Sequence, residues 1–217
     1  MDRAFGLPLE RGWPVRRLPS VRGGAHVGWW YSVRARRLVA YESAIERDAL
    51  MMLDRDRQVV GLSSQPMRLC WRLLPGSGIY ADQITHVPDV FVRYVSGAGV
   101  VLNCRRRAAR SRQAEALLPA TCAMAGWGYA VCVELDHVMA STLRWLADYR
   151  HSRYCSASLR QRVLNSCEQP RRLTELAAVD DPMRTLPAVY HLLFYGELQV
   201  DLRQPLSYAS VVMRARS

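Results

Sequence analysis

The spacing of hydrophobic and polar residues changes along the chain, and these changes outline an α/β domain. Apolar positions at helical spacing predict a helix after Ser43, whose hydroxyl precedes the Glu46 carboxylate by three residues, the spacing of a capping box. Apolar and β-branched runs between turn residues then predict strands at 59–62, 67–74, 86–94, 100–105 and 129–134. Helices are expected at 111–125, closed by Gly126, and at 138–149. This order of elements is typical of a layered α/β domain, in which 100–105 and 129–134 are apolar enough to be buried strands.

The two ends of the chain differ from this central pattern. Residues 1–40 begin with many Gly, Pro and Arg, which predicts a loose arm, and an aromatic run at 26–33 then predicts a short strand or hairpin. After the basic segment 149–153, we expect three short helices and a β-hairpin, at 159–167, 173–177, 185–196 and 198–212. Three helices and a hairpin form the plan of a winged helix, which reads DNA or docks on protein. The predicted parts are an arm (1–40), an α/β domain (41–154) and a winged-helix-like domain (155–217).

The charge of the chain favours a phosphate-bearing partner. Its 217 residues include 30 basic and 19 acidic side chains, a net charge of +11, and every basic residue is arginine. The absence of lysine excludes Schiff-base enzymes and P-loop nucleotide binding. A GC-rich genome accounts for the missing lysine but not for the positive excess. Because guanidinium groups bind phosphate in a fork, we expect duplex DNA as a partner.

Cysteine usage and hydropathy bear on the compartment. The six cysteines contain no C-x-x-C pair, so a zinc site is not expected. The N-terminus has no signal-peptide pattern, and no run approaches 18 apolar residues. We therefore expect reduced thiols in a cytoplasmic protein that has no membrane partner.

Four polar side chains have the arrangement of a nuclease site. Glu46 lies on the first predicted helix and Asp89 on a strand, while Asn103 and Arg105 share one face of the next strand. Restriction-endonuclease-like nucleases arrange carboxylates in this way to hold Mg²⁺, which activates water. Simpler interpretations stay open: Glu46 as a capping-box carboxylate, Asp89 as a turn residue, and the other two as solvated side chains.

A set of short segments, in order and spacing over residues 26–154, resembles the TnsA-like endonuclease subunit of heteromeric transposases. The segments are Tyr41-Glu42-Ser43, Glu46-Arg47-Asp48, Ser64-Gln65-Pro66, His86-Val87-Pro88-Asp89, Gly126-Trp127-Gly128-Tyr129 and residues 143–151. The resemblance implies a restriction-endonuclease-like mixed sheet flanked by helices, with a winged-helix-like domain at the C-terminus. It also implies cutting of DNA at transposon ends, in a complex with a DDE-type transposase subunit and an AAA+ ATPase.

The resemblance assigns site residues one by one. Its two acids map onto Glu46 and Asp89, and its triplet maps onto Asn103-Cys104-Arg105. Mg²⁺ or Mn²⁺ would then be bound by the two carboxylates and the backbone carbonyl of Cys104. DNA-binding residues are expected at Arg105, Arg106, Arg107, Arg110 and Arg112.

The triplet departs from the family pattern, which leaves two functions open. Asn103 offers a neutral amide, and Arg105 replaces a lysine and cannot give up a proton. One function is a metal-dependent endonuclease in which Arg105 supports the transition state. The other is a catalytically degenerate DNA-binding or assembly subunit, in which Arg105 pairs with Asp89 in place of a metal. With only two carboxylates, metal binding is expected to be weak or absent. A winged-helix transcription regulator is a third interpretation that leaves the first 150 residues unexplained.

Overall fold

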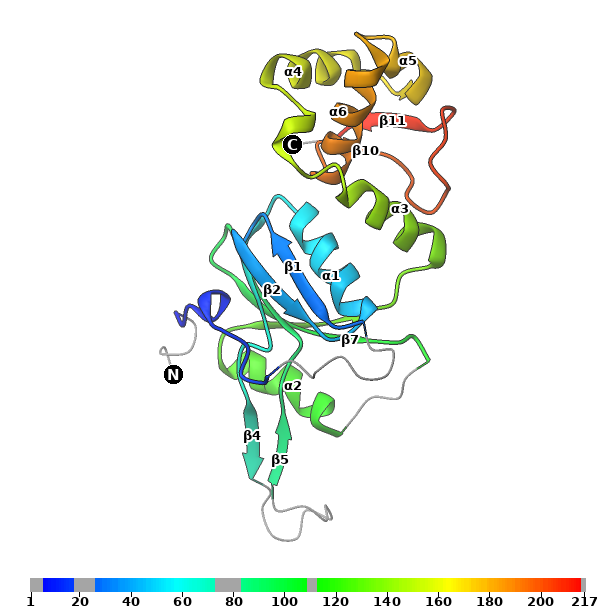
Figure 1. Cartoon of the computed structure of the whole chain (residues 1–217). Coiled ribbons are helices and arrows are strands. Elements are labelled where there is room, and N and C mark those ends of the chain that lie inside the picture. Colours follow the sequence, from blue (N-terminus) through cyan, green and yellow to red (C-terminus); the bar gives the residue numbers. More distant parts are fainter. Residues whose placement is uncertain (1–5, 18–25, 73–82, 109–112, 216–217) are drawn as a thin grey trace. The chain divides into compact units, whose positions relative to one another are not determined.

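The computed structural model describes residues 6–17, 26–72, 83–108 and 113–215. The chain divides into two compact units (Figure 1). The first unit consists of residues 1–50 and 58–134, and the second of residues 51–57 and 135–217.

A four-stranded mixed sheet forms the centre of the first unit. Its strands lie in the order β3 (Val59–Ser64), β6 (Val90–Tyr94), β7 (Gly99–Arg105) and β8 (Gly128–Val133). Neighbours are antiparallel except β7 and β8, which are parallel and are connected through α2 (Gln113–Met124). As predicted, Gly126 ends α2, because its φ of 75° suits glycine and lets the N–H of Trp127 reach back to Cys122. The α/β class is confirmed.

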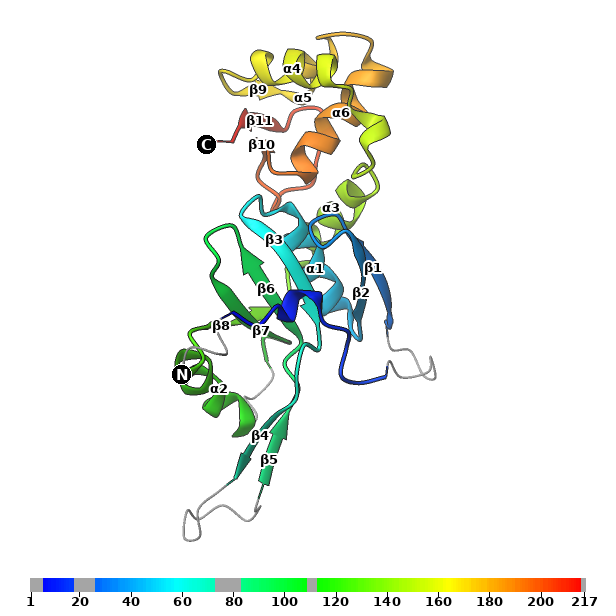
Figure 2. The same cartoon turned by 90° about the vertical axis from the view of Figure 1, so that its left-hand side faces the viewer.

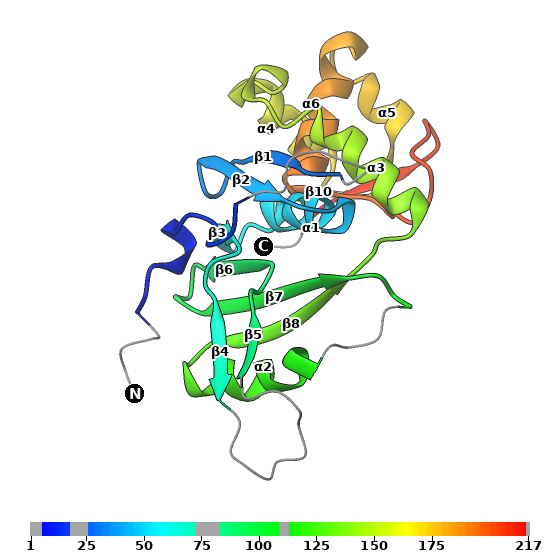
Figure 3. The same cartoon turned by 60° about the horizontal axis from the view of Figure 1, so that its bottom comes forward.

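The sheet of the first unit is covered on both faces (Figure 3). On one face lies α2, and Phe91, Val101, Cys122 and Trp127 form a buried cluster there. The start of α1 (Ala44–Arg55) lies on the other face, with the antiparallel pair β1 (Gly28–Ser32) and β2 (Arg37–Tyr41). This pair is the short hairpin expected from the aromatic run.

The predicted single strand over 86–94 is wrong, because the chain breaks at Val87–Asp89. The residues before the break form β5 (Gln83–His86), which pairs with β4 (Leu69–Arg72) in a separate two-stranded ribbon (Figure 2). The residues after it form β6. Pro88 has no N–H to give to a ladder, so a change of sheet at this point loses no hydrogen bond from that residue. Asp89 therefore lies just before a strand and not within one.

The predicted burial of 129–134 is also wrong. Strand β8 is the last strand of the described sheet, its residues are half-buried or exposed, and the side chain of Val133 is 38% exposed. Its apolar composition predicted a central strand, but composition does not show how many neighbours a strand has.

The second unit contains four α-helices and a small antiparallel sheet within the described residues. The helices are α3 (His137–Ala147), α4 (Ala157–Ser166), α5 (Leu173–Ala177) and α6 (Pro182–Phe194), with the 3₁₀ turn η2 (Ser152–Tyr154). The strands β9 (Arg171–Arg172), β10 (Leu198–Gln199) and β11 (Val211–Arg214) lie in the order β10-β11-β9. The apolar residues of α6 form the core of this unit, since Ala188, Val189, Leu192 and Leu193 are fully buried. No helix in the described residues is long and apolar enough to cross a membrane.

The predicted start of this helix at residue 185 is wrong, because α6 begins one turn earlier. Asp181 is the N-cap residue and its carboxylate accepts the N–H of Met183, while Pro182 occupies the first helical position. Thr185 is instead buried, and its hydroxyl donates to the carbonyl of Asp181. Pro187 lies inside the helix.

The division between the units comes after Glu134 and not after Tyr154. Helix α3 packs on α6, where the rings of Trp145 and Tyr190 are 4.5 Å apart. His191 Nδ1 donates to the carbonyl of Tyr149 at 2.8 Å, and the hydroxyl of Tyr195 donates to the carbonyl of Arg150 at 2.7 Å. These contacts hold the basic segment 149–153 on α6, which its composition did not indicate.

Candidate active site

A cavity of about 690 Å³ opens where α1 and β6 begin and β7 ends. Six of the predicted site residues line it: Glu46, Asp89, Asn103, Cys104, Arg105 and Arg106. Arg107 lies outside this lining, and its N–H donates to the Glu134 carboxylate. Arg110 and Arg112 lie outside the described residues.

Glu46 closes a capping box and also faces the cavity. Its Oε2 accepts the N–H of Glu42 at 2.8 Å, and its Oε1 accepts the hydroxyl of Ser43 at 2.9 Å. The Ser43 oxygen in turn accepts the N–H of Glu46 at 3.1 Å. Burial raises the pKa of Glu46, and the negative charges of Asp89 and Glu42 add to this effect. The same carboxylate can therefore start the helix and contribute negative charge to the cavity.

Asp89 is fixed by the main chain of the neighbouring strand. Its Oδ2 accepts the N–H of Cys104 at 2.6 Å, and its own N–H donates to the carbonyl of Leu102 at 3.2 Å. Burial raises the pKa of Asp89 to about 6, although the Cys104 N–H and the charge of Arg16 act in the opposite direction. A nearby cation stabilises the ionised form of a carboxylate whose pKa is raised by burial.

The side chains of the triplet point to both faces of β7. Asn103 and Arg105 share a face, as predicted, since neighbouring residues of a strand alternate. The Asn103 amide is within 3.2 Å of His86 Nε2, and Arg105 Nη1 lies 3.6 Å from Glu115 Oε2. Arg105 thus pairs with Glu115 and not with Asp89, which contradicts the pair considered for a degenerate site.

The backbone carbonyl of Cys104 is directed toward the cavity. The N–H of Cys104 points to the β6 side of β7, and in a strand the N–H and C=O of one residue point to the same side. The carbonyl of Arg105 points to the β8 side, where it accepts the N–H of Glu134. Because Asp89 precedes the first residue of β6, the Cys104 carbonyl lies beyond the end of that ladder and is suitably placed as a ligand.

Arg16 belongs to the site although the sequence did not single it out. Its Nη2 lies 3.0 Å from Glu42 Oε2, and its positive charge lowers the pKa of Asp89. Backbone contacts connect the two segments: the N–H of Val15 donates to the carbonyl of Gln65, whose own N–H donates to the carbonyl of Asp89. No motif surrounds Arg16, so nothing in the spacing indicated it.

The N-terminal segment that carries Arg16 is fixed on the sheet, contrary to the loose arm predicted for it. Side chains of Arg37, Ser63 and Arg93 donate to its backbone carbonyls. The acceptors are Leu7, Leu9, Arg11 and Gly12, at 2.6–2.8 Å. Sequence composition could not show this, because the donors come from three distant strands.

Opposite charges are balanced around the cavity. Its lining includes four carboxylates and four guanidinium groups: Glu42, Glu46, Asp89, Glu115, Arg16, Arg68, Arg105 and Arg106. Arg16 pairs with Glu42 and Arg105 with Glu115, and the negative charge of Asp89 contributes to the raised pKa of Glu46. A cavity of this kind can bind a cation and a phosphate together.

The residues present fit a magnesium ion for which the protein supplies only some of the ligands. Among the described residues, no group of three or more His, Cys, Asp or Glu side chains could hold a metal ion. Mg²⁺, however, is commonly bound by one or two carboxylates, with water and substrate phosphate as the other ligands. Glu46, Asp89 and the Cys104 carbonyl supply such a partial set.

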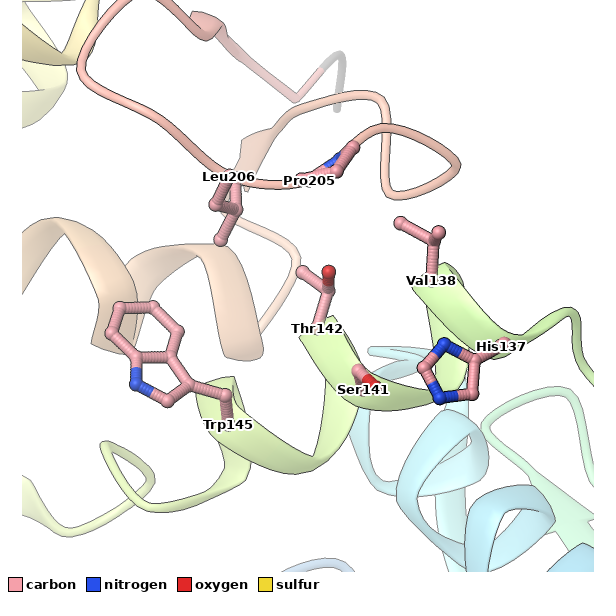
Figure 4. Close-up of a pocket in the computed structure, with 7 residues that line it drawn as sticks. All are labelled: His137, Val138, Ser141, Thr142, Trp145, Pro205 and Leu206. Carbon is pink, nitrogen blue, oxygen red and sulfur yellow. The ribbon is translucent and has the colours of Figure 1, made fainter.

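A second cavity, of about 420 Å³, lies within the second unit and has a different character (Figure 4). One wall is a face of α3 with Val138, Thr142 and Trp145, and the other is a loop with Pro205 and Leu206. Its lining contains no carboxylate or guanidinium group. It can accept an apolar group but has no pair of titratable side chains for hydrolysis.

The first cavity is therefore where carboxylates and guanidinium groups of this chain lie together. In comparisons with protein-family models and with curated proteins, nothing matches this chain.

Proposed function

We propose that this chain is the DNA endonuclease subunit of a heteromeric transposase and cuts at transposon ends by metal-assisted hydrolysis. The observation that carries the proposal is the placement of Glu46 and Asp89 in one arginine-lined cavity. The mixed sheet with helices on both faces agrees with the restriction-endonuclease-like fold that the resemblance implies.

The side chains of the cavity have distinct roles in this proposal. Glu46, Asp89 and the Cys104 carbonyl would hold Mg²⁺ or Mn²⁺, which when bound activates water and stabilises the leaving oxygen. The N–H of Cys104 keeps Asp89 oriented. Arg16 and its neighbours Arg68 and Arg106 in the cavity bind oxygens of the DNA phosphates. In the reaction, water oxygen adds to phosphorus and the bond from phosphorus to the sugar oxygen breaks.

The Arg105 guanidinium stabilises charge at phosphorus and is not a proton donor. Its ion pair with Glu115 restricts the direction of the guanidinium. A lysine at this position would carry a compact point charge. Arginine keeps the positive charge there but places it on a longer, planar side chain.

The second unit is proposed to be a winged-helix-like domain that docks on a partner protein. The order α4, β9, α5, α6, β10, β11 and the sheet order β10-β11-β9 support this fold. The apolar face of α6 is used in the core, and the Met183 side chain at its start is 83% exposed. We propose a DDE-type transposase or an AAA+ ATPase as the partner, in the cytoplasm.

A catalytically degenerate subunit is the second candidate, and two contacts favour it. The Asn103 amide is engaged by His86, and Arg105 by Glu115, so both triplet side chains have structural partners. In this case the cavity would bind DNA ends without cutting them.

A cleavage assay separates the two candidates. The full chain is mixed with the transposase encoded beside its gene and a plasmid carrying the transposon ends, with Mg²⁺, Mn²⁺ or EDTA. An endonuclease gives metal-dependent cuts that Asp89→Asn abolishes, while the surface control Asp201→Asn keeps them. Binding of ends with no cut under any metal condition supports the degenerate subunit. The absence of both cutting and binding would overturn the proposed function.

A further inference from the structure

Two thiols lie side by side on the face of the sheet opposite to α2. The parallel ladder of β7 and β8 pairs Cys104 directly with Cys132, and both cysteines are free. Side chains in register on neighbouring strands point to the same face, and their Cα atoms are about 4.8 Å apart. This separation lies inside the range of about 4.4–6.8 Å found in disulfides.

The other cysteines lack this relationship. Cys70 is exposed on β4, Cys122 is in the buried cluster under α2, and the remaining two belong to the second unit. In the described strand ladders, Cys104 and Cys132 are the one cysteine pair in register.

The position of the two cysteines in the sheet favours both access of an oxidant to the thiols and formation of a disulfide between them. Both residues are half-buried, so a small oxidant can reach them. Cys132 is on β8, which pairs only with β7 in the described sheet. An outer strand can move by the few tenths of an ångström needed to bring the Cβ atoms from about 4.8 Å to within the range of about 3.5–4.5 Å found in disulfides.

We propose that Cys104 and Cys132 form a peroxide-oxidisable dithiol that closes to a disulfide. One sulfur, as thiolate, attacks a peroxide oxygen, the O–O bond breaks and hydroxide leaves, which gives a sulfenic acid. The second sulfur attacks this sulfur atom and the S–O bond breaks. Two thiols and one hydrogen peroxide give one disulfide and two waters, and the two electrons lost by sulfur reduce the peroxide. The proposal does not depend on the proposed function.

Peptide mapping tests the pair directly. The reduced full chain is treated with one to ten equivalents of hydrogen peroxide, alkylated with iodoacetamide, digested with trypsin and analysed by mass spectrometry. The expected product joins peptide 94–105 to peptide 113–144 through Cys104 and Cys132, and dithiothreitol separates them. Fragment spectra distinguish Cys132 from Cys122, which lies in the same peptide.

Variants keep the test independent of adventitious oxidation. Cys104→Ser and Cys132→Ser should each abolish the cross-link, while Cys122→Ser and Cys70→Ser should leave its yield within about twofold of wild type. Circular dichroism verifies that each variant is folded. Full alkylation of Cys104 and Cys132 under conditions that oxidise exposed Cys70 would overturn the proposal. So would a cross-link from Cys104 to Cys122 as the main product.

Discussion

The backbone N–H of Cys104 donates to Oδ2 of Asp89 over 2.6 Å, so the main chain of β7 positions one of the two predicted acids of the cavity. A bond from the main chain is insensitive to the side chain at position 104. The position of Asp89 therefore depends on the pairing of β6 with β7, and through it on the whole sheet.

The raised pKa of Asp89 has a consequence for stability. Between pH 4 and about 6 the folded state keeps a proton that the unfolded state has lost, so the free energy of unfolding falls as pH rises through this range. Asp89→Asn removes the cost of the buried charge and keeps an acceptor for the Cys104 N–H. We expect this variant to be more stable than wild type at pH 7 by about 1–3 kcal/mol, and equally stable at pH 4. Urea unfolding at several pH values measures both, and lower stability of the variant at pH 7 would contradict the prediction.

Glu46 is expected to have separable structural and chemical roles. Glu46→Ala loses both capping contacts and should lower the free energy of unfolding by about 1 kcal/mol. Glu46→Gln keeps an oxygen acceptor for the Glu42 N–H and should change stability by less than about half of that. Both variants should lose metal-dependent cleavage. Chemical denaturation with a parallel cleavage assay checks this, and full activity in Glu46→Gln would rule out a role for the charge.

Arg16 offers a matched test against its neighbour. Arg16→Ala removes the guanidinium beside Glu42 and Asp89, whereas Arg17→Ala removes an equal charge from an exposed position outside the cavity lining. Arg16→Ala should weaken binding of DNA ends and reduce the salt slope of affinity by about 1. The Arg17 variant should change affinity less. Fluorescence anisotropy at several salt concentrations measures the slopes, and equal effects would argue for nonspecific charge alone.

The chain should bind duplex DNA without divalent metal, because its net charge of +11 comes from arginine. If about six phosphates are neutralised, the logarithm of affinity should fall with the logarithm of salt concentration at a slope near −5. A titration in EDTA from 50 to 300 mM salt gives this slope. A slope near zero would show that phosphate contacts contribute little.

Arg55 is expected to stabilise the second unit through the end of α6. Its Nε donates to the carbonyl of Phe194 at 3.1 Å and its Nη2 to that of Leu193 at 3.0 Å. A cation at a helix C-terminus also interacts favourably with the helix dipole. Arg55→Met should lower the free energy of unfolding by about 2 kcal/mol, and Arg55→Lys by less. Thermal unfolding followed by circular dichroism measures the difference, and no change in Arg55→Met would contradict it.

Local signals in the sequence were sufficient for several parts of this fold. The capping box of Ser43 and Glu46 marked the start of α1, and Gly126 marked the end of α2. Alternation placed Asn103 and Arg105 on one face of β7. These features depend on residues a few positions apart, whose preferences persist in any tertiary context.

Only the tertiary structure decided what those residues contact. In the folded chain Asp89 lies before the strand and accepts the Cys104 N–H. Arg16 lies beside Glu42, and Arg105 pairs with Glu115. Each partner comes from a different element, and one sequence carries no local signal for contacts that form when distant strands and helices pack together. The sequence alone therefore indicated the acids of the site, while the packing of the sheet determined which cations surround them.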